Sequence, residues 1–120
     1  TISHDAHNLI VVGGSDVDMA AAANRCVELG GGLVVCNQGR VLAELPLPIG
    51  GLMSDLPAEQ VRQKLNACDQ AARELGSADW LGENPTMILT YLALTAANPQ
   101  TITDKGFVNI EKRQIESIFF

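Results

Sequence analysis

The stretch GGGLVVCNQGRVLAELP, residues 30–46, decides the fold that this sequence predicts. Two aliphatic runs, Leu33–Cys36 and Val41–Leu45, flank a short polar segment that contains Gly39. This spacing favours two antiparallel strands joined by a tight turn, with Gly39 at a positive φ that other residues rarely adopt. Pro46 has no N–H to donate to a sheet, so the second strand should end there. The sequence therefore predicts a hairpin, which brings antiparallel pairing into the sheet.

Helices are predicted on both sides of this hairpin. Upstream, Ser15 followed by Asp18 is a capping-box-like helix start, and the glycines at 30–32 stop that helix with a left-handed residue. Downstream, apolar residues recur at spacings of four and three from Val61 to Leu75, which is the period of a helix with one buried face. The sequence therefore predicts two main helices.

Further strands complete the predicted architecture. Asn8–Gly13 carries four successive aliphatic residues between polar residues and glycines, a pattern that predicts a buried strand. A further strand is predicted at Thr86–Leu94, and short strand candidates follow around Ile102, at Phe107–Ile110 and at Ile115–Phe120. The order βαββαβββ predicts an α/β (α+β) fold in a single domain, residues 1–120, with a mixed β-sheet flanked by the two main helices.

Composition excludes several classes of protein. The chain has 14 acidic and 8 basic residues, a formal net charge of −6, and no basic stripe that could follow a phosphate backbone. Nucleic acid is therefore not expected as a partner. No apolar run approaches the roughly 20 residues that span a bilayer, and no signal sequence is apparent, so no membrane partner and a cytoplasmic location are expected.

Three cysteines, Cys26, Cys36 and Cys68, are odd in number and lie far apart in apolar surroundings. That pattern favours packed thiols in a reducing compartment over disulfide bonds or metal ligands.

Both histidines of the chain lie in the segment SHDAHN, residues 3–8, directly before an aliphatic run. Imidazole and carboxylate groups exchange protons near neutral pH, so His4, Asp5 and His7 are candidate catalytic residues. A solvated N-terminal tail is the alternative interpretation. In an extended segment His4 and His7 would point to opposite faces, so no metal site is assigned to them. Because no Ser or Cys of the sequence sits in a nucleophile elbow, the chain lacks a complete catalytic set.

A second unusual segment, residues 46–54, has an apolar, glycine-containing composition that loops usually avoid. One interpretation is structural, in which the segment packs under the sheet and caps the following helix. The other is a loop that docks on another domain or covers a pocket, where methionine adapts its shape and glycine permits close backbone approach. The candidate contact residues are Ile49, Gly50, Gly51, Leu52, Met53 and Ser54.

Several blocks of this sequence resemble the C-terminal domain of bacterial adenine deaminases, which are members of the amidohydrolase superfamily. The blocks occur in the family's order and cover most of the chain: SHDAHN at 3–8, DMA at 18–20, GGGLVV at 30–35, LPLPIGGLMS at 45–54 and TDKG at 103–106. The sequence departs from the family pattern at residues 94–99, where Leu-Pro-Val-Ile-Pro would be expected, and after Ile110. Those departures put the contact made by that loop in doubt.

The resemblance implies an accessory domain of a metal-dependent adenine deaminase, a hydrolase acting on C–N bonds of cyclic amidines in purine metabolism and salvage. In that family a barrel upstream of the present Thr1 holds manganese or iron and activates water for attack on adenine, leaving hypoxanthine and ammonia. The barrel is absent from this chain, which would bind no cofactor itself and would be inactive alone. The chain begins with Thr1 rather than Met, so either a processed chain or a piece of a longer polypeptide is expected, and a piece is the preferred interpretation.

The implied partners are the upstream barrel of the same polypeptide, adenine as substrate of the whole enzyme, and further copies in a homo-oligomer. His4, Asp5 or His7 would reach the mouth of the barrel's active site, where it could hydrogen-bond the purine or shuttle a proton. The alternative is a noncatalytic small-molecule-binding or protein-interaction module.

Overall fold

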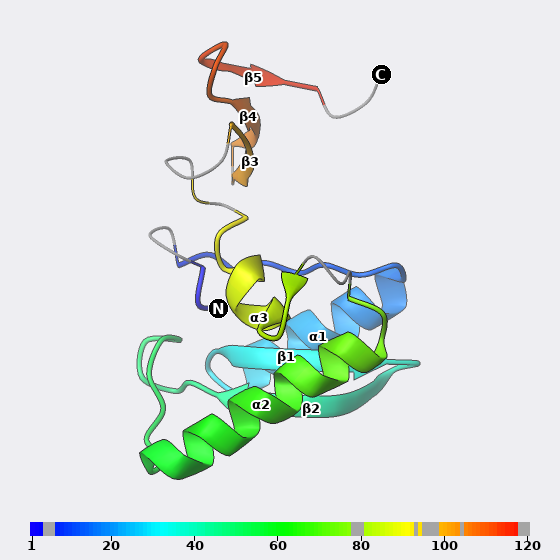
Figure 1. Cartoon of the computed structure of the whole chain (residues 1–120), viewed down its shortest axis with the longest axis vertical. Coiled ribbons are helices and arrows are strands. Elements are labelled where there is room, and N and C mark those ends of the chain that lie inside the picture. The colour runs from blue at the N-terminus through cyan, green and yellow to red at the C-terminus, as the bar shows by residue number, and fades with distance from the viewer. Residues whose placement is uncertain (4–6, 78–80, 93, 95–98, 104, 118–120) are drawn as a thin grey trace.

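The computed structural model describes residues 1–3, 7–77, 81–92, 94, 99–103 and 105–117. These residues form an α+β fold (Figure 1) with two antiparallel sheets, of strand order β1-β2 and β3-β4-β5. The elements are α1 (Asp16–Glu28), β1 (Gly32–Asn37), β2 (Arg40–Pro46), α2 (Ala58–Glu74), α3 (Pro85–Leu89), β3 (Gln100–Thr103), β4 (Gly106–Asn109) and β5 (Gln114–Glu116). The fold class and the two main helices, α1 and α2, are as predicted. Among the described residues, none of the helices has the length and apolar character needed to cross a membrane.

The hairpin forms where the sequence predicts it. β1 and β2 pair antiparallel from Gly32 opposite Pro46 to Asn37 opposite Arg40. The two residues between the strands, Gln38 and Gly39, both have positive φ, at 51° and 73°. Positive φ at both central positions is the turn geometry whose twist matches that of the flanking strands. The predicted hairpin and the predicted conformation of Gly39 are therefore confirmed.

The hairpin lies between α1 and α2, so this part of the molecule has three layers (Figure 1). Strand side chains alternate between faces, and one face of the hairpin packs against α2. The buried centre of that contact is Leu45, Leu47 and Cys68, surrounded by the partly buried Ile2, Leu33, Val35, Ala43, Val61 and Leu65. The other face of the hairpin is left for α1.

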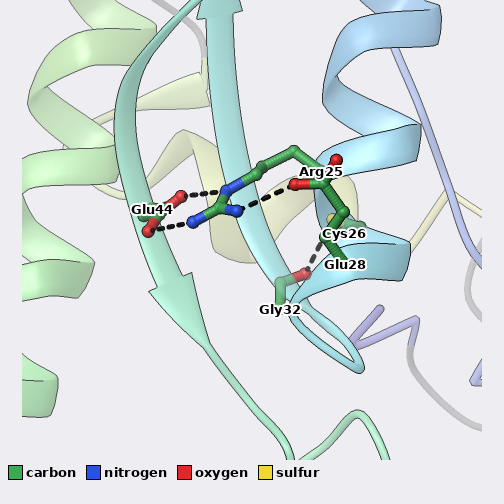
Figure 2. Close-up of polar contacts among 5 residues, drawn as sticks. All are labelled: Arg25, Cys26, Glu28, Gly32 and Glu44. Atoms are coloured by element: carbon green, nitrogen blue, oxygen red, sulfur yellow. Dashed lines mark hydrogen bonds and ion pairs between the residues drawn. The ribbon is translucent and has the colours of Figure 1, made fainter.

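An ion pair holds α1 to its face of the hairpin (Figure 2). Arg25 donates from Nε to Glu44 Oε2 at 2.8 Å and from Nη2 to Glu44 Oε1 at 3.0 Å, while its Nη1 donates to Glu28. The hydrogen bonds from Arg25 hold the pKa of the Glu44 carboxyl below its usual value. The predicted N-cap of α1 is also confirmed, because Ser15 Oγ accepts from the Asp18 N–H at 3.3 Å.

The three cysteines are free thiols, as predicted. Cys26 and Cys68 are buried, and burial raises the pKa of the Cys68 thiol to about 12. The Cys26 thiol donates to the carbonyl oxygen of Gly32 at 3.6 Å (Figure 2). Cys26 and Cys68 therefore serve as packed side chains, as their apolar sequence surroundings predict.

The strand predicted at Thr86–Leu94 is wrong, because Pro85–Leu89 forms the short helix α3. Proline suits a first helical position, and the exposed N–H groups of the first turn need an acceptor. Asp69 of α2, only 3% exposed, supplies one: its Oδ1 accepts from the Thr86 N–H at 3.0 Å and from the Thr86 hydroxyl at 2.5 Å. An acceptor 17 residues away in sequence therefore favours helix over strand.

The single mixed sheet that the sequence predicts is replaced by two separate antiparallel sheets. β3, β4 and β5 pair with their neighbours in sequence, so this sheet forms through local turns. It joins the rest of the molecule at Leu92, whose carbonyl accepts from Thr101 Oγ1 and from the Ile102 N–H. Most of the divergent segment 94–99, and residues 118–120 at the chain end, lie outside the described residues.

The run Asn8–Gly13 enters neither ladder, so in this structure it is not the buried strand that its pattern predicts. Leu9 is 44% exposed and Val12 is 61% exposed. Thr1 lies at the position beside Gly32 that a neighbouring strand would use, with its nitrogen donating to the Gly32 carbonyl at 2.7 Å. The order of elements from α1 onward otherwise follows the prediction, apart from α3.

Candidate functional site

The N-terminus, the start of β1 and the loop after β2 meet at one end of the hairpin. Thr1 joins all three: its hydroxyl donates to the Gly51 carbonyl at 2.5 Å and accepts from the Gly32 N–H at 2.9 Å. We call this cluster, Thr1, Gly31, Gly32 and Gly51, the loop junction. It brings together three segments that lie far apart along the chain: the N-terminus at Thr1, the block at 30–35 and the block at 45–54.

Glycine is required where the backbones cross at the loop junction. A Cβ on Gly31 would lie 2.4 Å from the Gly51 Cα and 3.2 Å from the Leu47 carbonyl oxygen, far inside contact distance in the first case. Both glycines also have left-handed φ, 120° at Gly31 and 74° at Gly51, and both are buried. The Leu47 N–H donates to the Gly31 carbonyl at 2.9 Å, and this hydrogen bond holds the segment after β2 against Gly31. The junction therefore depends on close backbone approach.

The predicted contact loop is fixed at its base and exposed at its tip. Ile49 and Met53 exchange backbone hydrogen bonds at 3.1 and 3.2 Å. Their side chains are 48% and 60% exposed, whereas Gly51 is buried against Thr1. Ser54 Oγ accepts from the Leu56 N–H at 3.2 Å ahead of α2. The backbone of the loop packs on the hairpin, as the structural interpretation predicts, but the loop does not cap α2, whose N-cap is Pro57 with no side-chain hydrogen bond. The role of the loop as a contact with another domain stays a prediction.

Of the three candidate catalytic residues, His7 alone is described; His4 and Asp5 lie outside the described residues. The His7 side chain is exposed, its φ is 52°, and its N–H donates to the Ser3 carbonyl at 2.8 Å. Ser3 is fully buried and its N–H donates to the Thr1 carbonyl at 3.0 Å. The motif therefore starts at the loop junction, and its histidine at position 7 faces solvent.

Among the residues that the structure describes, no group of three His, Cys, Asp or Glu side chains is placed to hold a metal ion. The manganese or iron that the resemblance implies for the parent enzyme therefore does not fit this part of the chain. What the loop junction offers is a scaffold, in which Thr1 and the glycines set the relative position of the N-terminal motif and the loop at 49–54.

Sequence reasoning identifies the loop and the N-terminal motif but not the residues that join them. The role of Thr1 could not be predicted from the sequence, because its hydrogen-bond partners lie 31 and 50 residues away along the chain. The two glycine clusters, 30–32 and 50–51, are the available indication, because paired glycines are typical of places where backbones approach closely.

Fold and site together define the class of the chain, a small α+β domain with a glycine-dependent loop junction. The sequence model of the adenine deaminase C-terminal domain matches residues 1–114, and the chain belongs to that family. It is 52% identical over 112 residues, 93% of its length, to an adenine deaminase of Brucella anthropi. It is 45% identical over 99% of its length to an adenine deaminase of Desulfatibacillum aliphaticivorans, and 41% identical over 99% of its length to one of Kosmotoga olearia. The chain spans about a fifth of the length of these relatives, 19% to 20%.

Proposed function

We propose that this chain is the accessory C-terminal domain of an adenine deaminase, the hydrolase that converts adenine to hypoxanthine and ammonia. One observation carries the proposal: the chain matches proteins named adenine deaminase over 93% to 99% of its own length but over only about a fifth of theirs. An enzyme domain that is always one part of a longer chain contributes to that chain's activity by packing, by positioning groups, or by both.

In this proposal the rest of the polypeptide supplies the catalytic barrel, and the isolated chain is inactive. The metal bound there, manganese or iron, supplies activation of the attacking water. The parent would act in the cytoplasm, in purine salvage, as a homo-oligomer. The alternative, a noncatalytic small-molecule-binding or protein-interaction module, stays a prediction.

The N-terminal motif is proposed to reach the mouth of the barrel's active site. The loop junction supports this, because it holds Thr1 in place immediately before the motif and, through Thr1, the first motif residue, Ser3. A histidine mounted there could donate a hydrogen bond to a purine nitrogen, and a carboxylate could accept one from a purine N–H. Either group could also carry a proton to or from solvent. His4, Asp5 and His7 are the candidates for that role.

The loop at 49–54 is proposed to pack on the upstream part of the same polypeptide. Ile49 and Met53 expose apolar side chains beside the loop junction, where the N-terminal motif also starts. Exposed apolar side chains in a glycine-rich loop favour a contact that excludes water. The motif and the loop would then belong to one docking face.

A Met53→Asp substitution tests this contact. In the isolated chain the free energy of unfolding should change by less than about 0.5 kcal/mol, because the Met53 side chain is 60% exposed. In the complete enzyme the same substitution should bury a charge and lower thermal stability or deaminase activity clearly. Thermal unfolding and adenine turnover measure the two effects.

The matched control for that experiment is Val17→Asp, which places the same charge on a side chain of α1 that is 73% exposed. If Met53→Asp and Val17→Asp are equally harmless in the complete enzyme, the loop does not contact the upstream domain.

A further inference from the structure

β1 has a partner strand on one edge only. Its ladder to β2 is antiparallel, with Gly32 opposite Pro46 and Val34 opposite Glu44. The Gly32 N–H and carbonyl point away from β2, since both are bound to Thr1. Backbone groups alternate along a strand, so the Val34 N–H and carbonyl point to the same side as those of Gly32. Beyond Thr1, the part of the chain that the structure describes places no strand against that edge.

The aliphatic run before α1 lies across a cavity from this free edge. The cavity, about 660 Å³ in volume, is lined by Asn8–Ser15 and by Gly32–Asn37, and also by residues of α1, the end of α2 and α3. In Figure 1 the blue segment that precedes α1 passes on the side of β1 opposite to β2. Within the described residues, a strand edge and an apolar segment that both lie outside the ladders therefore border the same cavity.

The composition of the run fits this edge. Leu9, Ile10, Val11 and Val12 are four aliphatic residues in succession, a pattern typical of a strand that is covered on both faces. The edge of β1 offers such a place, because α1 and α2 both pack against β1, from opposite sides of the hairpin. At present Leu9 and Val12 are 44% and 61% exposed, so their burial there would remove apolar surface from water.

The connection between the run and β1 is of the kind that joins two neighbouring parallel strands. α1 lies between them in sequence, and a strand, a crossover helix and a parallel strand form the unit that joins neighbouring parallel strands. Gly13 and Gly14 follow the run, and a Cβ on Gly14 would meet nothing within 4 Å. A Cβ on Gly13 would lie 2.8 Å from Met19 Cγ, so glycine at both positions leaves the connection to α1 its backbone freedom.

We propose that residues 9–12 form a strap that closes onto the free edge of β1 as a third, parallel strand. Closure pairs the Val34 N–H and carbonyl, fills the cavity and buries Leu9 and Val12. It also carries the neighbouring His7 and Asn8 to the end of β1, which gives the N-terminal motif a rigid mount. This inference concerns the chain itself and does not depend on the proposed deaminase role.

Amide hydrogen exchange of the 120-residue chain, followed residue by residue by NMR at two protein concentrations, tests the strap. The Val34 amide should be protected to an extent similar to the Val35 amide, which lies in the ladder to β2. Val12→Asp should speed exchange at Val34 at least tenfold and leave Val35 within about twofold, because closure would bury the new carboxylate. Val17→Asp, an equally exposed valine outside the strap, should leave Val34 within about twofold.

Three results would overturn the proposal. Exchange at Val34 at the rate of an unprotected amide in the unsubstituted chain would mean that the edge stays open. Protection that grows with protein concentration would mean that a second copy supplies the strand. Protection that Val12→Asp leaves unchanged would mean that another group covers the edge. If Val12→Asp unfolds the chain, exchange at Val35 rises as well, and the result for the unsubstituted chain decides.

Discussion

Replacing Gly31 with alanine is expected to lower the free energy of unfolding by about 2 to 6 kcal/mol. Two costs combine at this position. An L-residue held at φ 120° is strained by roughly 1 to 3 kcal/mol. The added Cβ would also lie 2.4 Å from the Gly51 Cα, and forcing the two backbones apart is an overpacking cost of about 1 to 3 kcal/mol. Urea unfolding of the chain measures the sum.

Two other glycines serve as matched controls for this substitution. A Cβ added to Gly14 would meet no atom within 4 Å and the residue has no left-handed φ, so Gly14→Ala should change stability by less than about 0.5 kcal/mol. Gly39 has φ 73° and open space, so Gly39→Ala should show the cost of backbone strain without the clash. If Gly31→Ala is no worse than Gly39→Ala, the backbones at the loop junction are not in the close contact described.

Single alanine replacements of His4, Asp5 and His7 in the complete enzyme are expected to lower adenine turnover at least tenfold at one position. A positioned acid or base commonly contributes about 10² to 10⁴ in rate, so loss of a true proton carrier should be plain in kcat. Steady-state kinetics with adenine, measured across pH, would separate loss of substrate binding in KM from loss of proton transfer in kcat.

Conservative replacements provide the control for this series. His7→Gln and Asp5→Asn keep the size of each side chain but remove its titration. A residue needed only for packing should be rescued by such a change, whereas a proton carrier should not. Near-normal kinetics for all three alanine variants would show that the N-terminal motif does not contribute to catalysis.

Those parts of the fold that rest on local patterns were predictable from the sequence. The hairpin follows from two aliphatic runs around Gly39, and α1 follows from Ser15 and the glycines that end it. The helix α3 was not predictable, because its first turn is stabilised by Asp69, which comes from another helix. The pairing of β3 to β5 as a separate sheet likewise depends on which strands meet, which no single segment encodes.

The segments that make up the candidate site could be predicted from the sequence, but the contacts between those segments could not. The loop at 49–54 and the motif at 3–8 are recognisable by composition, but the hydrogen bonds of Thr1 that join them bridge 31 to 50 residues of sequence. Ile49 and Met53 at the tip of the loop are exposed, and the contact predicted for them with another domain stays a prediction. The roles of His4 and Asp5 stay predictions, since both residues lie outside the described part of the chain.

Ammonia release from adenine, measured with manganese or ferrous iron present, tests the proposed role most directly. The comparison needs four samples: this chain alone, the upstream part of the polypeptide alone, the two mixed, and the intact parent. An accessory domain that the reaction requires predicts turnover by the intact parent, none by either part alone, and recovery on mixing. Turnover by this chain alone, or full turnover by the upstream part without it, would contradict the account.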